Sequence, residues 1–182
     1  MGRSFSVPRP EILIEDFARN NSYYHAASDT HYQMLRHGDR IFQRRYQVGE
    51  DGRETNVDEK EADYIVGSGN HMRTYVHRNA DGTLLQLPLA WYAEKGGYWA
   101  MNPGFDTTDY PYALRRIGYD CMFCHNAHPR TPAGHDRLGD VPVYTGDLPQ
   151  ESIASAATVP ASGMSRSHRR LARSPTRSAA PS

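Results

Sequence analysis

Short stretches rich in β-branched and aromatic residues, separated by turn residues, fill the chain from Tyr23 to Met101. Their lengths and spacing predict β-strands at residues 31–35, 41–48, 62–66, 72–78, 84–92 and 98–101. The segment Asn79-Ala80-Asp81-Gly82 has the composition of a hairpin turn. A short helix is expected within residues 7–20. The pattern predicts a mainly β fold, an antiparallel meander, followed by an irregular, loop-rich segment from Asn102 to Cys121.

The length of 182 residues fits one domain of ordinary size, with segments of different composition at its ends. We place an N-terminal segment at residues 1–22, the domain at residues 23–150 and a disordered tail at residues 151–182. The tail contains one acidic residue and five arginines, whereas residues 1–150 contain 20 acidic against 16 basic residues, a net charge of −4. A mildly acidic domain gives no support for nucleic-acid binding. No run approaches the roughly 18 apolar residues of a membrane span, so no transmembrane segment is predicted.

The only two cysteines of the chain lie in Cys121-Met122-Phe123-Cys124-His125, which is the Cys-x-x-Cys-His signature of covalent c-type haem attachment. Two thiols three positions apart can each add to one vinyl group of the porphyrin. The histidine that follows at once can then bind the iron from one face of the ring. The motif therefore predicts haem c as cofactor, with Cys121 and Cys124 forming the thioethers and His125 as an axial ligand.

The two alternative uses of the cysteine pair are a structural zinc site and a thioredoxin-like redox pair. A structural zinc site would need a second pair of ligands at short spacing. His71 and His77 are six positions apart and His128 and His135 seven, so neither pair fits that spacing. A thioredoxin-like redox pair would need a βαβ context in which Cys121 opens a helix, and the Gly-, Tyr- and Pro-rich approach to the motif does not suggest one.

Several further stretches of the chain carry a family resemblance. They are Ser28-x-x-His31-Tyr32, Asp51-Gly52-Arg53-Glu54-Thr55-Asn56, Asp63–His71, Trp91–Trp99, Asn102–Asp106 and Cys121–Asn126. Together they resemble secreted bacterial multihaem cytochromes of the cytochrome c-552/c-554 type, many of which are fused to C-terminal tetratricopeptide repeats. The resemblance covers about Gly2 to Gln150 and is more specific than the haem signature alone.

The resemblance implies a larger protein than this chain. Members of the family usually have a further haem signature upstream of a segment similar to Met1–Phe5, and another after the region that matches Asp147–Gln150. Neither signature occurs here, and no repeat of tetratricopeptide period occurs. Met1 to Asn20 also lacks the apolar core of a secretory signal, although haem c is attached outside the cytoplasm. We therefore expect a fragment, truncated at both ends, of a periplasmic or otherwise extracytoplasmic parent.

The family implies that a second histidine commonly completes the iron coordination. His71 is the first candidate because it follows Gly67-Ser68-Gly69, whose glycines would let the chain approach a flat ring. His135, which follows Pro132-Ala133-Gly134 on a loop long enough to fold back, is the second candidate. His25 and His31 near a predicted strand start could also reach a haem, and cross-ligation with a haem from another motif stays open.

Aromatic and arginine side chains could complete a haem pocket. Tyr64, Tyr75, Trp91, Tyr92, Tyr98 and Trp99 could exclude water from the ring, or they could simply form the core of the sheet. Arg73 and Arg78 could pair with haem propionates, or they could occupy solvated strand faces.

No enzyme signature is present: the chain has no Gly-rich phosphate loop, no Gly-x-Ser-x-Gly elbow and no His-Glu-x-x-His. The sequence therefore predicts an electron-transfer module rather than an enzyme, with redox proteins and other haem domains as its expected partners. The alternatives are a non-catalytic interaction module or non-functional fragment of a multihaem protein, and a small zinc-binding domain.

The tail after Gln150 shows signs of a displaced reading frame. Its composition changes abruptly to Ala, Ser, Arg, Pro and Thr. When Glu151 to Met164 is back-translated with suitable third bases, the frame one base earlier reads Gly-Ile-Asp-Cys-Gln-Arg-Cys-His-Gly-Pro-Gly-Glu-Arg-His. This is a second haem signature at the place where the family would have one. We therefore expect that the tail is a frameshift product and that a second haem site has been lost.

Overall fold

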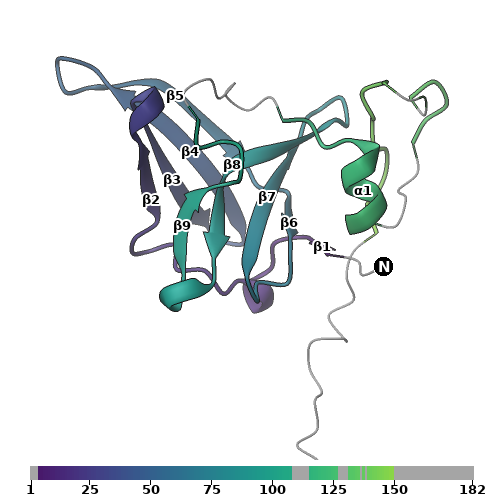
Figure 1. Cartoon of the computed structure of the whole chain (residues 1–182), viewed down its shortest axis with the longest axis horizontal. Helices are drawn as coiled ribbons and strands as arrows, with labels where there is room; N and C mark the ends of the chain where they lie inside the picture. The colour runs from purple at the N-terminus through teal and green to yellow at the C-terminus, as the bar shows by residue number, and fades with distance from the viewer. Residues whose placement is uncertain (1–3, 108–114, 127–130, 136, 138, 150–182) are drawn as a thin grey trace, which may run out of the picture. The chain divides into compact units, whose positions relative to one another are not determined.

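The computed structural model describes residues 4–107, 115–126, 131–135, 137 and 139–149. Within these residues the chain forms nine β-strands in two antiparallel sheets and one α-helix, with three short 3-10 turns (Figure 1). The strands are β1 (Phe5–Ser6), β2 (Ser22–His25), β3 (Thr30–His37), β4 (Arg40–Val48), β5 (Glu54–Glu61), β6 (Tyr64–Val66), β7 (Met72–Arg78), β8 (Leu84–Tyr92) and β9 (Tyr98–Met101). The helix α1 spans Tyr119–His125. The 3-10 turns are η1 (Pro10–Ile12), η2 (Ala26–Ser28) and η3 (Glu94–Gly96).

The prediction of a mainly β, antiparallel fold is confirmed, but the strands form two meanders instead of one. The order is β2-β3-β4-β5 in the four-stranded sheet and β1-β6-β7-β8-β9 in the five-stranded sheet. Only β1 breaks the sequential order, because Phe5 pairs with Val66 and Ser6 with Ile65. The first strand of the chain thus belongs to the sheet formed by its later strands.

The predicted hairpins are present, but β1, β2 and β5 were not among the predicted strands. β3 and β4 meet at a tight turn in which Gly38 has a φ of 64°, and β7 and β8 meet at the predicted Asn79–Gly82 turn. β5 has the sequence Glu-Thr-Asn-Val-Asp-Glu-Lys-Glu and shows no apolar alternation. It is an edge strand, paired only with β4, and charged side chains are typical of exposed sheet edges.

The helix predicted within residues 7–20 is wrong, because only η1 forms there. Side chains take up the backbone donors that a helix would use. The Asp16 carboxylate accepts the N–H groups of Ala18 and Arg19 at 2.9 and 3.0 Å, a local turn that competes with helical bonding. Glu15 turns inward and is 8% exposed, so this segment is held by contacts with the sheets.

The five-stranded sheet is covered on both faces. Along β8, Leu87, Leu89 and Trp91 face the four-stranded sheet, while Leu84 faces the other way. This explains why eight of its nine positions are apolar, since a strand buried on both faces loses the alternation of a half-exposed one. We call the side between the two sheets the inter-sheet core and the side beneath α1 the helix-side cluster.

The inter-sheet core is built almost entirely from strands. Its buried members are Tyr32, Met34, Ile41, Ala62, Ile65, Tyr75, Leu87, Leu89, Trp91, Trp99, Met101 and Phe105. The aromatics predicted either for a haem pocket or for the sheet divide between the two sides. Tyr75, Trp91 and Trp99 belong to this core, and Tyr64 belongs to the helix-side cluster. Tyr92 and Tyr98 stack on one another with ring centroids 5.3 Å apart.

The inter-sheet core is closed at one end by a buried ion pair. The Arg73 guanidinium donates to Glu15 Oε1 at 3.1 Å, and the Tyr75 hydroxyl donates to the same oxygen at 2.6 Å. Arg73 also donates to the backbone oxygens of Ile12 and Ser68 at 2.7 and 3.2 Å. Burial and the neighbouring carboxylate raise the pKa of Tyr75 well above its usual value, so the phenol stays protonated and donates. This cluster ties the N-terminal segment to the five-stranded sheet.

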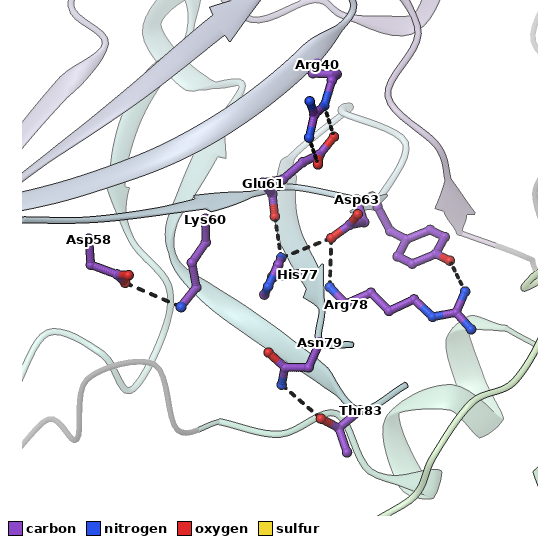
Figure 2. Close-up of polar contacts among 10 residues, drawn as sticks. Arg40, Asp58, Lys60, Glu61, Asp63, His77, Arg78, Asn79 and Thr83 are labelled. Atoms are coloured by element: carbon purple, nitrogen blue, oxygen red, sulfur yellow. Dashed lines mark hydrogen bonds and ion pairs between the residues drawn. The ribbon is translucent and has the colours of Figure 1, made fainter. Parts of the chain in front are cut away.

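A second polar group lies where β5 leads into β6 (Figure 2). The Asp63 carboxylate accepts the Arg78 backbone N–H at 2.8 Å and lies 3.1 Å from His77 Nδ1. His77 Nδ1 also lies 2.9 Å from the backbone oxygen of Glu61, whose side chain pairs with Arg40. These contacts join the end of the four-stranded sheet to the first strands of the five-stranded sheet.

Candidate functional site

The cysteine motif forms the short helix α1, which the sequence did not indicate. The seven-residue helix follows Gly118, which has an extended backbone, and ends at Asn126, whose N–H donates to Met122 O at 2.8 Å. Asn126 is fully buried, and its side-chain amide donates to the Pro149 backbone oxygen at 2.6 Å. A helix of two turns is marginal by itself, so packing at Met122 and Asn126 must hold it.

Helical geometry sorts the motif into two faces. Residues three and four positions apart lie on the same face of a helix, so Cys121, Cys124 and His125 lie together. Met122 is 1% exposed and packs in the helix-side cluster, and Cys121 packs against the same cluster. Cys121 is half-buried, whereas Cys124 and His125 are exposed. The two thiols and the imidazole therefore form one patch, accessible at Cys124 and His125 and half-buried at Cys121, on a helix that Met122 anchors.

The helix-side cluster is assembled from distant parts of the chain. Its members are Phe5, Tyr64, Val66, Val76, Leu84, Ile117, Met122, Tyr144 and Leu148. Arg78 connects this side to the polar group of Figure 2, since its guanidinium donates to the backbone oxygens of Tyr144 and Gly146 at 2.6 and 3.0 Å. Tyr144 N–H in turn donates to Gly82 O at 2.9 Å.

His125 is fixed by a residue from the other end of the chain. Its Nδ1 lies 2.7 Å from Ser4 Oγ, and its backbone oxygen accepts the Ser4 N–H at 3.0 Å. Histidines that bind metals through one ring nitrogen commonly form a hydrogen bond through the other. The contact with Ser4 occupies Nδ1, which leaves Nε2 as the atom for a metal. Sequence reasoning missed Ser4, because nothing local links two residues 121 positions apart.

The cysteine pair carries no disulfide. Burial is the main factor that raises the pKa of the Cys121 thiol, and the Asp120 carboxylate acts in the same direction. Thiol–disulfide catalysts and thiolate metal ligands show the opposite shift. Cys121 therefore remains a thiol at neutral pH, unlike the activated cysteine of a thiol–disulfide catalyst.

His71 lies in the loop between β6 and β7 and is exposed. This loop is connected to the motif through Ser4, whose backbone oxygen accepts the Gly67 N–H at 3.0 Å. Gly67 and Gly69 are both required by close packing within the fold, where a side chain would not fit. A Cβ on Gly67 would lie 2.6 Å from Met72 O, and one on Gly69 would lie 2.8 Å from Arg73 Nε. The structure gives no hydrogen bond or ring contact between His71 and His125 in the part of the chain that it describes.

His135 lies elsewhere. It ends a turn in which its N–H donates to Pro132 O at 3.1 Å, and it lines a shallow hollow of about 340 Å³ with Asp81, Thr83 and Arg116. None of the three motif residues lines this hollow. The two candidates for the sixth ligand thus occupy different places, and neither contacts His125 among the described residues.

His25 and His31 have protein partners. His25 is 1% exposed and contacts Ser28 Oγ at 2.7 Å and Asp106 Oδ1 at 3.3 Å. His31 stacks on the outer face of the four-stranded sheet, 5.1 Å from the Tyr46 ring and 4.7 Å from the Tyr24 ring. His128 lies outside the described residues. The described ranges contain no cluster of three or more His, Cys, Asp or Glu side chains arranged to hold a metal ion.

The two arginines considered for haem propionates have other partners in this structure. Arg73 is paired with Glu15 inside the inter-sheet core, and Arg78 binds backbone oxygens near Tyr144. The helices in the described ranges are all too short or too polar to cross a bilayer.

No family model, curated protein or solved structure matches this chain in the three comparisons made.

Proposed function

We propose that this chain is an electron-transfer module that binds haem c covalently through Cys121, Cys124 and His125. The observation that carries the proposal is the patch on α1, with both thiols and the imidazole on one face of an anchored helix. A further support is the contact between His125 Nδ1 and Ser4 Oγ, which orients the ring for binding through Nε2.

The residues fit the group, and each has a separate task. Cys121 and Cys124 would each add a thiol across one vinyl group, and the two thioethers would fix the haem against α1. His125 would bind the iron through Nε2, while Met122 and Asn126 hold the helix to the domain. When bound, the haem supplies an iron that alternates between ferric and ferrous states. The chain would supply a histidine ligand and the local polarity that tune its reduction potential.

We propose further that the parent protein is an extracytoplasmic multihaem cytochrome, which exchanges electrons with redox proteins or with neighbouring haem domains. The support is the series of sequence stretches that resemble cytochromes of the c-552/c-554 type, and the second haem signature that suitable third bases would place in the displaced frame of the tail. Residues 150–182 lie outside the described part of the chain, so the test is genetic. Sequencing must find TGC and TGC-CAC over Ile153 to Thr158 in the displaced frame, and any other bases there contradict the frameshift.

Covalent attachment is tested by producing the chain with an export signal in a host that matures c-type cytochromes. A haem-stained denaturing gel should show a band for the wild type, because thioether-linked haem survives denaturation. Cys121→Ala should retain at most one thioether, and the Cys121→Ala, Cys124→Ala double variant should retain none. Covalent haem that survives acid–acetone extraction in the double variant would refute the proposal. Zinc without stain would support the zinc-binding alternative.

The sixth ligand is tested by spectroscopy of the haem-loaded chain. If His71 is the ligand, His71→Ala converts a low-spin ferric spectrum to high spin and His135→Ala does not. The reverse result assigns the role to His135. A spectrum unchanged in both variants excludes both residues and points to His31, His25 or a ligand from another chain.

A further inference from the structure

Ser4 is fixed by three hydrogen bonds around the axial histidine. Its Oγ lies 2.7 Å from His125 Nδ1, and its N–H donates to His125 O at 3.0 Å. Its own carbonyl accepts the Gly67 N–H at 3.0 Å, where the β1–β6 pairing ends. The serine is therefore held by its backbone on both sides, and its short side chain has little freedom to leave the imidazole.

The contact selects between two forms of a neutral imidazole. A neutral histidine carries its proton on one ring nitrogen, and only the other nitrogen can bind a metal. A serine hydroxyl can donate or accept a hydrogen bond. When Ser4 Oγ accepts from Nδ1–H, the lone pair lies on Nε2, which is the form that can bind iron. The same bond also fixes the rotation of the ring on the exposed end of α1.

We propose that Ser4 is a positioning residue for His125, one that holds its proton on Nδ1 and aims Nε2 away from the protein. The inference rests on the proposed function, because Nε2 matters only if His125 is an axial ligand. A histidine that donates through Nδ1 is a more basic ligand, and a more basic ligand favours ferric over ferrous iron. Loss of the Ser4 hydroxyl should therefore raise the reduction potential of the loaded chain.

The haem-free chain provides the first test. Nitrogen NMR of histidine-labelled protein reports which ring nitrogen of His125 carries the proton. We expect the wild type to show Nδ1–H, and Ser4→Ala to lose that signal in favour of Nε2–H. Ser4→Thr keeps a hydroxyl and should restore the wild-type spectrum. Ser6→Ala is the matched control, because it removes a hydroxyl two residues further along, in β1, whereas the hydroxyl next to His125 Nδ1 is that of Ser4.

The loaded chain provides the second test and separates the two proposals. The midpoint potential should rise in Ser4→Ala, return in Ser4→Thr and stay unchanged in Ser6→Ala. The same tautomer in Ser4→Ala and wild type, or equal changes in Ser4→Ala and Ser6→Ala, overturns the role of Ser4. If no covalent haem forms on the wild type, the proposed function fails, while the haem-free spectra still decide whether Ser4 sets the tautomer.

Discussion

Residues on the two faces of the five-stranded sheet are equally well buried, but the two faces are covered by different kinds of chain segment. Leu89 in the inter-sheet core and Met122 in the helix-side cluster are both at most 1% exposed. The inter-sheet core comes almost wholly from strands that pair with their neighbours in sequence. The helix-side cluster brings together β1, the short helix and loop residues such as Ile117 and Tyr144. The candidate site lies on the side that depends on contacts between distant segments.

The inter-sheet core and the helix-side cluster should therefore have different tasks: the first stabilises the fold, and the second holds the candidate site. Regular hairpins form through local pairing and provide a firm support. Loop segments pack on that support and can carry exposed chemical groups, as functional residues in many folds do. We therefore expect damage to the inter-sheet core to unfold the chain, whereas damage to the helix-side cluster should act mainly on α1.

The largest expected effect concerns the buried ion pair of the inter-sheet core. Glu15→Ala leaves the Arg73 guanidinium buried without its carboxylate, and such changes typically cost about 3–5 kcal/mol in the free energy of unfolding. Urea denaturation followed by circular dichroism measures the loss. Glu11→Ala, which removes an exposed carboxylate from the same segment, is the control and should change stability by less than about 0.5 kcal/mol. Equal effects of the two variants would contradict the role of the pair.

The second prediction compares the two faces directly. Leu89→Ala should destabilise the chain by about 3 kcal/mol, because a cavity between two regular sheets cannot collapse easily. Met122→Ala should cost about 2 kcal/mol, since a two-turn helix can shift to fill the space. Hydrogen exchange should show faster exchange throughout the sheets for Leu89→Ala, but mainly in α1 for Met122→Ala. The comparison fails if Met122→Ala exposes both sheets as Leu89→Ala does.

The smallest expected effect is a pH dependence at the polar group between the sheets. The hydrogen bond with Asp63 is the main factor that raises the pKa of His77 above its usual value in the folded chain. The contact therefore contributes its full stability below the unfolded pKa and loses it as pH rises through the higher folded pKa. We expect less than about 1 kcal/mol, because both side chains are partly exposed.

Urea denaturation at about pH 6 and about pH 8 measures this change. His77→Gln should abolish the additional stability at the lower pH. His37→Gln alters a histidine on the β3–β4 hairpin and should leave it intact. A pH dependence that survives in His77→Gln would assign it to another group.

The fold was predictable wherever a pattern repeats locally. The alternation in β3 and β4, and the turn at Asn79–Gly82, follow from residues close together in sequence. β5 could not be found this way, because its charged residues form a strand only through pairing with β4. The expected helix near the N-terminus failed because Glu15 is stabilised by Arg73, a partner 58 positions away.

In the candidate site, too, the features set by local sequence were predictable and those set by distant contacts were not. Cys121, Cys124 and His125 are adjacent in sequence, so their spacing alone identifies them as one group. The helix that aligns them depends on burial of Met122, and the orientation of His125 depends on Ser4. Neither dependence leaves a local pattern.

The pairing of Ser4 with His125 also sets an order of events during synthesis. A ribosome adds about 5–20 residues per second, so Ser4 emerges on the order of ten seconds before the residue that it contacts 121 positions later. Until then the hairpins can form, but the helix-side cluster lacks α1. Both cysteines are therefore synthesised before the helix-side cluster can close, and protection of Ser4 from solvent would mark the moment at which α1 has packed against the N-terminal segment.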